Sequence, residues 1–167
     1  PSHLSARFKV KKSMKEEKAK AFFLEGYNCA QAVLLTFADD LGMDKNTAAK
    51  LASSFGGGMG RLREVCGAVS AMFMIAGILR GYADPKGHRA KAEHYRRIQK
   101  LARRFEEIHG SIVCRDLLGL AEKSDCSIPE QRTADYYRKR PCVQLVGDAA
   151  RILEEMIRQE NTKKSSR

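Results

Sequence analysis

The chain has 167 residues, 43% of them hydrophobic, and its 31 Lys and Arg against 20 Asp and Glu give a formal net charge of +11. This length suits one compact domain with a buried core, and the hydrophobic content with only four prolines excludes wholesale disorder. The longest dense apolar stretch, residues 65–79, is too short to cross a bilayer, so we expect no membrane span.

The N-terminal part predicts a basic, flexible segment followed by a helix. Residues 1–12 lack the compact apolar run and cleavage pattern of a secretory signal, so we expect a cytoplasmic protein. Because the chain begins with Pro1 and not with Met, its native start is left undefined. The first helix is expected over residues 13–25, with Ser13 as its N-cap and Glu16 as the capping-box partner.

Two short helices with polar N-caps are expected next. The first covers residues 29–40 after the cap Asn28 and stops at Gly42. The second follows the cap Asp44 and carries an apolar face that ends at Phe55.

A glycine run then interrupts the helical pattern, with Gly56, Gly57, Gly58 and Gly60 separated by a single Met. A phosphate-binding loop needs a preceding strand and a following Lys-Ser or Lys-Thr pair, and the sequence has neither. We interpret the run as a close approach of backbone to a cofactor or to another helix, because glycine has no Cβ atom. The alternative is a flexible hinge.

The next two helices form the predicted centre of the fold. One begins at residues 63–66 and continues to Leu79; it is apolar almost all round and should be the buried central helix. Pro85 is expected to open the longest helix, which ends at Gly110. Its apolar seam contains five residues at steps of four and three, namely His94, Ile98, Leu101, Phe105 and Ile108.

The C-terminal part predicts a short helix capped by Ser111, a polar irregular stretch over residues 121–140, and a last helix opened by Pro141. We expect one helical domain over residues 13–158 and a basic tail over 159–167. No repeat and no linker interrupts this pattern. The fold class is therefore all-α, a single-domain multi-helix bundle around a buried central helix.

The cysteines give the strongest functional signal. Five occur, and an odd number argues against a simple disulfide framework. They form no CxxC or CxxCH motif and are too far apart for a zinc ribbon, so any shared site must be assembled by the fold. Cys126 lies in the polar stretch, whereas four cysteines fall in the first turn of an expected helix: Cys29, Cys66, Cys114 and Cys142.

This placement predicts a chemistry. A helix N-terminus presents unpaired N–H donors and the positive end of the helix dipole, which stabilise a thiolate and should lower a cysteine pKa. The four cysteines are thus candidate metal ligands, with Cys66 as the candidate redox thiolate. Alternatively, they are ordinary core cysteines, which behave as small hydrophobic residues.

Other catalytic signals are weak. His94 lies on an apolar seam, and we interpret it as a core histidine, with a ligand or proton donor near the sulfurs as the alternative. The chain contains no HExxH pair, no serine elbow and no paired-carboxylate arrangement, so it carries no hydrolase or transferase signature.

Five parts of the sequence together resemble a known pattern. They are residues 26–32 around Cys29, the glycine run, residues 66–71 (CGAVSA), residues 114–119 around Cys114, and the pair 141–142. The pattern is that of a family of small redox-active proteins with four spaced cysteines and a CGAxxG motif at the second. The closing glycine of the motif is replaced by Ala71. The resemblance implies redox activity at the four cysteines and adds Gly67 to the glycines expected near a cofactor. A similar module accompanies the haem region of split-Soret cytochromes, where an iron–sulfur site is suggested; without CxxCH, only the sulfur-centred part carries over.

Four hypotheses follow. The first is an electron-transfer or redox-sensing protein with an iron–sulfur cluster, of the two-iron type, that serves a redox protein partner. The second is a cofactor-free thiol/disulfide protein with Cys66 as the attacking group. The third is a structural zinc site.

The fourth hypothesis is a helical interaction or nucleic-acid-binding adaptor that uses the basic residues of 86–104, eight Lys and Arg against one Glu. Nucleic acid is the less favoured partner, because the chain lacks zinc-finger, RNP-type and Gly-rich RNA motifs. An acidic protein is the other candidate partner for this basic stretch. The nearly all-apolar central helix also predicts a homodimer.

Overall fold

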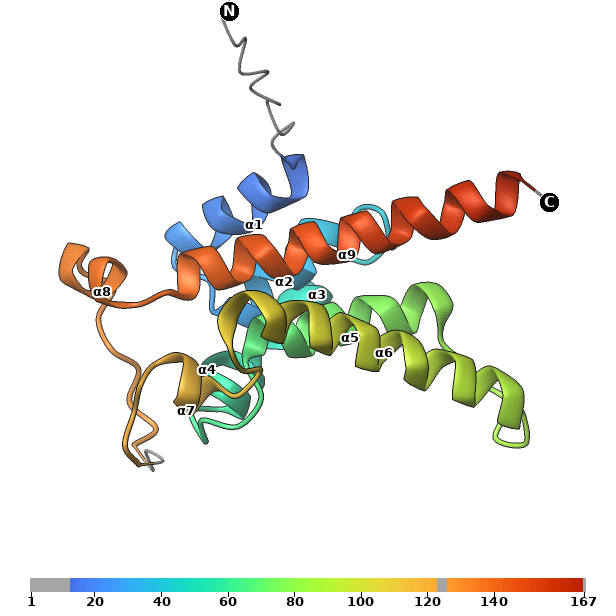
Figure 1. The fold of residues 1–167 in the computed structure, drawn as a ribbon. Helices are drawn as coiled ribbons and strands as arrows, with labels where there is room; N and C mark the ends of the chain where they lie inside the picture. Colours follow the sequence, from blue (N-terminus) through green and yellow to red (C-terminus); the bar gives the residue numbers. More distant parts are fainter. Residues whose placement is uncertain (1–12, 123–125, 167) are drawn as a thin grey trace, which may run out of the picture.

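The computed structural model describes residues 13–122 and 126–166, and this part of the chain is all-α. The predicted segment 1–12 lies outside the described residues. Figure 1 shows the helices in order: α1 (Met14–Leu24), α2 (Cys29–Phe37), α3 (Lys45–Ser53), α4 (Gly56–Met59), α5 (Gly67–Arg80), α6 (His88–His109), α7 (Cys114–Leu117), α8 (Ala134–Lys139) and α9 (Cys142–Ser165).

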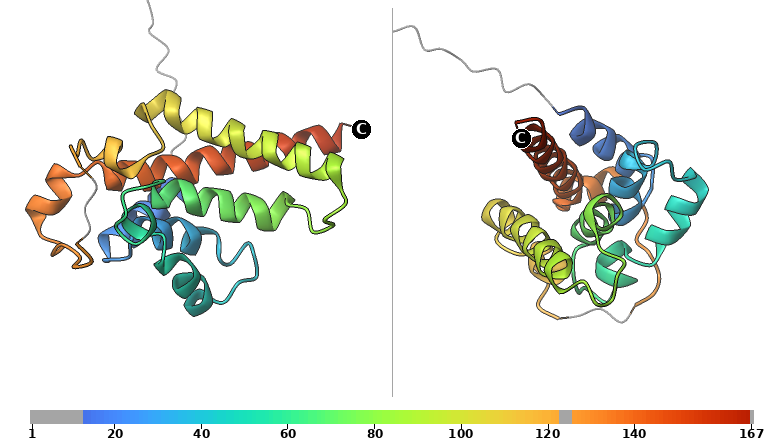
Figure 2. Two further views of the ribbon diagram at one scale, coloured as in Figure 1. Left: turned by 90° about the horizontal axis from the view of Figure 1, so that it is seen from below. Right: turned by 90° about the vertical axis from the view of Figure 1, so that its right-hand side faces the viewer.

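Two helices form the centre of the bundle. The predicted central helix α5 is confirmed, with eight of its 14 residues buried. Helix α2 is buried even more completely, along eight of its nine residues, and packs against α1, α3, α4, α5 and α9. The long helices α6 and α9 lie beside α5 and extend to the end of the molecule away from α8, where the C-terminus lies (Figure 2).

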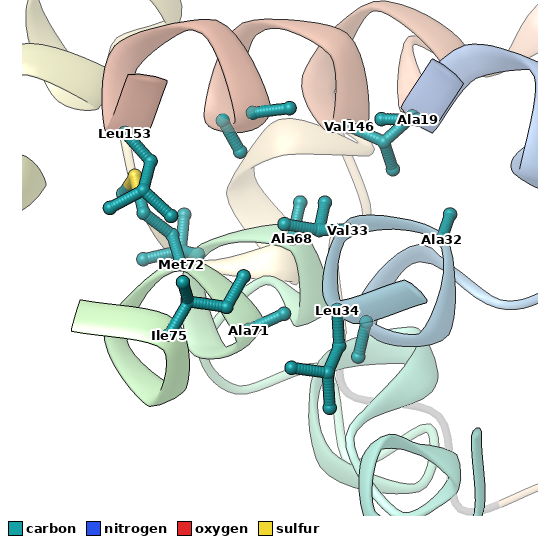
Figure 3. Close-up of a cluster of buried hydrophobic side chains, with 14 of the residues drawn as sticks. Ala19, Ala32, Val33, Leu34, Ala68, Ala71, Met72, Ile75, Val146 and Leu153 are labelled. Carbon is teal, nitrogen blue, oxygen red and sulfur yellow. The ribbon is translucent and has the colours of Figure 1, made fainter. Parts of the chain in front are cut away.

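Small residues let these helices approach closely. Ala32 of α2 and Ala68 and Ala71 of α5 have no exposed surface, and neither has Ala19 of α1. Larger side chains fill the space that remains (Figure 3), among them Val33, Leu34, Met72, Ile75, Val146 and Leu153. Burial of such side chains contributes roughly 1.5–3 kcal/mol each, so this cluster provides a rigid base for the helix ends beside it.

The start of α6 corrects the prediction. The helix begins at His88 and not at Pro85, because residues 84–87 form a turn of their own. The Asp84 carboxylate accepts from the Lys86 N–H at 2.9 Å, and the Asp84 carbonyl accepts from the Gly87 N–H at 3.1 Å. As a result α6 has 22 residues and α9, with 24, is the longest helix of the described part.

Three further differences lie at element ends. Ile108 of the predicted apolar seam is 46% exposed, because His109, four positions after Phe105, takes the packed place on the last turn of α6. The polar stretch 121–140 contains the short helix α8, which the sequence pattern did not indicate. Helix α9 continues through Ser165, so most of the predicted basic tail is helical.

The helix ends that carry the cysteines gather at one end of the bundle. The short helices α4 and α7 pack on each other and α4 packs on α2 and α5, while the start of α9 follows α8 (Figure 1). Among the described residues, none of the helices combines the length and apolar character that a bilayer span requires.

Candidate four-cysteine site

The predicted placement of the four cysteines at helix starts is confirmed. Cys29, Cys114 and Cys142 are the first residues of α2, α7 and α9, and Cys66 is the N-cap of α5. One cap differs from the prediction: α7 is preceded by Val113, and Ser111 instead accepts a hydrogen bond from the Val113 N–H at 2.9 Å.

Local interactions fix the first of these starts. The Asn28 side chain accepts from the Gln31 N–H at 2.8 Å, and the Gln31 side chain accepts from the Asn28 N–H at 3.0 Å. This reciprocal capping box defines where α2 begins. The Asn28 amide also donates to the Ser53 carbonyl at 3.2 Å, which ties the start of α2 to the end of α3.

Backbone hydrogen bonds join the segments that carry Cys66 and Cys114. The Cys66 N–H donates to the Ile112 carbonyl at 2.8 Å, and the Cys114 N–H donates to the Glu64 carbonyl at 2.6 Å. An antiparallel bridge between Val65 and Val113 lies between these bonds. Two cysteines that are 48 positions apart in the sequence are therefore held on adjacent, backbone-paired segments.

All four cysteines line a single cavity of about 260 Å³. Cys66, Cys114 and Cys29 are 4%, 7% and 9% exposed, and Cys142 is partly exposed. None of the four is in a disulfide. The predicted gathering of the cysteines at one place is thus observed, whereas Cys126 and His94 do not line this cavity.

The glycines have two separate roles at the site. Gly56, Gly57 and Gly60 line the cavity, and φ values of 66°, 70° and 64° place Gly57, Gly58 and Gly60 in the left-handed region, where glycine is favoured. Gly67 permits a close contact instead. A Cβ atom at this position would lie 2.6 Å from the Cys29 Sγ and 2.7 Å from the Phe55 carbonyl oxygen.

Four arginines also line the cavity, and the sequence analysis did not single them out. They are Arg61, Arg63, Arg132 and Arg140, and against the single acidic residue Glu130 they give the lining a net charge of +3. Their one sequence signal is proximity: Arg63 stands three positions before Cys66 and Arg140 two before Cys142.

Arg132 holds the polar segment against the start of the bundle. Its guanidinium donates to the carbonyls of Phe23 at 3.4 Å and Tyr27 at 3.0 Å. It also lies over the rings of Phe23 and Tyr136, at 4.4 and 4.9 Å from their centroids. These cation–π contacts place α8 as one wall of the cavity.

Burial determines the acid–base behaviour of the thiols, which corrects an expectation. Desolvation raises the pKa of Cys142 to about 12 and raises the pKa of Cys66 and Cys114 as well. The N–H groups of Val69 and Ala68 act on Cys66 in the predicted direction and lower its pKa, but they do not offset burial. Without a bound group, these three cysteines are thiols at neutral pH.

The cysteines also interact with one another and with the arginines. The charge of Cys29 raises the pKa of Cys66, Cys114 and Cys142, so Cys29 is near all three. Arg63 lowers the pKa of Cys114, and Arg140 lowers that of Cys114 and Cys142. Within the described ranges, no group of three or more Cys, His, Asp or Glu side chains is arranged to hold a metal ion as it stands.

The donor set nevertheless suits a sulfur-ligated group. Four free cysteines face one cavity, the arginine charge there complements bound thiolates, and Gly67 leaves room for the Cys29 sulfur. Simultaneous binding by all four requires their sulfurs to come closer together than they are in this structure.

His94 is buried in the middle of α6, which agrees with its interpretation as a core histidine. Its ring packs against Tyr82 with centroids 6.1 Å apart, and its Nδ1 is 3.5 Å from Arg97 Nη1. Burial lowers its pKa, so the ring is neutral at pH 7. It contributes to packing and not to the cavity.

Comparison with known proteins agrees with this arrangement. A family model described as "Putative redox-active protein (C_GCAxxG_C_C)" matches residues 27–156, a range that contains all four cavity cysteines. The chain belongs to this family, as its cysteine pattern predicted. No curated protein and no solved structure matches the chain.

Proposed function

We propose that this chain is an electron-transfer or redox-sensing protein in which Cys29, Cys66, Cys114 and Cys142 bind an iron–sulfur cluster of the two-iron type. The observation that carries the proposal is the convergence of these four cysteines on one cavity. An iron–sulfur cluster held by four cysteines supplies one-electron chemistry, with a potential set by charge, hydrogen bonds and exposure.

The size of the cavity supports a cluster over a single ion, and its charge suits either kind of centre with four thiolates. Four sulfurs at about 2.3 Å from one zinc ion surround it completely and leave no further space, whereas this cavity has about 260 Å³. A cluster with four thiolates is anionic and becomes more so on reduction. The net charge of +3 on the lining favours such an occupant.

The thiol pKa values disfavour the cofactor-free alternative. Disulfide exchange begins with a thiolate, and its rate falls with the thiolate fraction. Burial raises the pKa of Cys66, the candidate attacking group, and raises that of Cys142 to about 12. A metal displaces the thiol protons when it binds, so cysteines with raised pKa values can still serve as metal ligands. The same raised pKa values make them poor nucleophiles when no metal or base assists them.

The test is anaerobic reconstitution of the full chain with iron and sulfide. We expect bound iron, labile sulfide and visible absorbance, each lost when any one of the four cysteines is changed to Ser. The matched control is Cys126→Ser, which removes an exposed cysteine outside the cavity and should leave all three signals unchanged.

Other outcomes separate the alternatives. Zinc without sulfide, together with loss of helicity on chelation, would establish the structural zinc site. Reversible disulfides among the four, found by mass mapping in metal-free protein, would establish the thiol/disulfide protein. If neither iron nor sulfide binds and the cysteine variants do not change the spectrum, the cluster proposal is wrong.

A further inference from the structure

Arg63 is an unusual residue in the lining of the cavity. Its side chain is buried, at 3% exposed, whereas arginine is almost never fully buried without a partner of opposite charge. Within the described part of the chain no carboxylate forms an ion pair with it, and its buried Nε has no hydrogen-bond partner. Asp148, also buried, is by contrast paired with Arg151 at 3.0 Å.

Among the described residues, the polar side-chain contact of Arg63 is with a cysteine. Its Nη1 donates to the Cys114 Sγ at 3.7 Å, a long bond of the kind that sulfur accepts. The guanidinium passes close to Gly57, where an added Cβ atom would lie 3.5 Å from Nη1. The buried cation is thus directed toward the Cys114 sulfur.

The side chain of Arg63 reaches Cys114 from a backbone that is held in an unfavourable conformation. Its φ of 61° lies in the left-handed region, which is unfavourable for a residue other than glycine. The Arg63 N–H donates to the Gly57 carbonyl, and the Arg63 carbonyl accepts from the Arg115 N–H at 3.2 Å. The glycine run on one side and α7 on the other therefore fix where the side chain enters the cavity.

We propose that Arg63 is the positioning residue of the site: it orients Cys114 and supplies the positive charge and hydrogen bond that set the reduction potential of the bound centre. This inference rests on the proposed function and deepens it. An electron that enters the centre adds a negative charge, and a buried cation beside one ligand stabilises the reduced form more than the oxidised form. Arg63 therefore raises the potential.

The neighbouring cation Arg61 differs in this respect. It lies 3.9 Å from Glu130 and donates to the Cys126 carbonyl at 2.8 Å, so its charge is partly neutralised by other groups. Among the described residues no carboxylate pairs with Arg63, and its charge is left to act on the Cys114 sulfur.

The experiment compares Arg63→Met, Arg63→Lys and the control Arg104→Met in the reconstituted full chain. Arg104 pairs with Glu155 on the long helices, so its loss changes the net charge equally without altering the cavity lining. At the midpoint potential of the unaltered protein, Arg63→Met should lower the reduced-to-oxidised ratio about tenfold, or about 59 mV for one electron. Arg63→Lys should lower the potential by less than half as much as Arg63→Met does, and Arg104→Met should leave the potential unchanged.

A second measurement excludes a merely structural role. In the metal-free protein Arg63 is a buried cation without a counter-charge, so Arg63→Met should leave the midpoint of urea unfolding unchanged or raise it. Should Arg63→Met fail to fold, Arg63→Gln takes its place with the same expectations. An unchanged potential in the folded neutral variant, or a loss in the Lys variant as large as in the Met variant, overturns the inference. Absence of iron and sulfide from the unaltered chain would instead refute the proposed function.

Discussion

At the residue scale, Gly67 matters to the site because it has no side chain. An Ala at this position would place its Cβ atom 2.6 Å from the Cys29 Sγ and 2.7 Å from a carbonyl oxygen of Phe55, which belongs to the main chain and cannot rotate away. We predict that Gly67→Ala lowers the free energy of unfolding by about 1–3 kcal/mol, a typical cost of overpacking. It should also reduce iron retention, because Cys29 must move.

The matched control is Gly77→Ala on the same helix. An added Cβ atom there meets nothing within 4 Å, and the position is helical, so the change should stabilise the protein by about 0.5–1 kcal/mol. Urea unfolding of both variants, with iron analysis, checks the pair. Equal stability of the two variants would show that Gly67 is not needed for this contact.

Individual residues differed in how well the sequence revealed them. The positions of Cys29 and Cys142 at helix starts followed from neighbours next to them, Asn28 and Pro141, and local caps can be identified from sequence. The role of Arg63 could not be identified from the sequence, because its burial depends on a left-handed backbone conformation and on Cys114, which is 51 positions away. The effect of burial on the thiol pKa values was missed for the same reason.

At the element scale, the cap of α2 connects stability to the site. Asn28 satisfies one N–H at the helix start and contacts the end of α3, so Asn28→Ala should cost about 1 kcal/mol of unfolding free energy. Because Cys29 is the next residue, we also expect faster loss of iron. Thermal unfolding and the half-life of the visible absorbance measure the two effects.

Asp44→Ala provides the comparison for that variant. Asp44 caps α3 by accepting from the Thr47 N–H at 2.9 Å, on an exposed surface away from the cavity lining. The Asp44→Ala variant should lose a similar amount of unfolding free energy, but its visible absorbance should persist as long as that of the unaltered protein. If both variants lose iron equally, general stability and not the position of Cys29 governs retention.

Helices with clear apolar periodicity were predictable, and those without it were not. Helices α2, α3 and α5 were expected close to where they lie, because caps and buried faces agree. Helix α8 has no buried residue and was missed; it is held by the Thr133 cap and by contacts of Arg132 with aromatic rings of α1 and of α8 itself. The start of α6 was misplaced because Asp84 stabilises a turn in place of a helix.

At the scale of the whole molecule, the buried thiols predict a loss of stability in alkali. Above pH 9.0, the ordinary pKa, a cysteine of the unfolded chain releases its proton, whereas Cys142 keeps its proton in the folded protein up to about pH 12. The unfolded state then binds fewer protons, so unfolding becomes more favourable by about 1.4 kcal/mol per pH unit for each such group.

Urea unfolding of reduced, metal-free protein checks this between about pH 8 and pH 10. Stability should be constant with respect to Cys142 below its ordinary pKa and decline above it, and the decline should be smaller in Cys142→Ala. A variant with the same pH slope as the unaltered chain would show that this thiol ionises as readily as an exposed one.

The overall architecture was predictable from the sequence, whereas the assembly of the site was only partly predictable. Helical periodicity and the absence of linkers gave the all-α single domain, with its apolar helix at the centre. The convergence of four helix starts could be inferred from the cysteines, but the arginines of the lining come from the loops before α5, α8 and α9, whose packing depends on the complete fold.

Helix α9 carries a cavity cysteine on its first residue and ends at Ser165, a span of about 36 Å at 1.5 Å per residue. Near its other end Glu160 binds Arg80 of α5 and Arg97 of α6, at 3.2 and 2.8 Å. One continuous helix therefore joins the cysteine end of the bundle to the ion pairs that fix α5 and α6 at the other end, so the position of Cys142 is tied to the packing of the whole bundle.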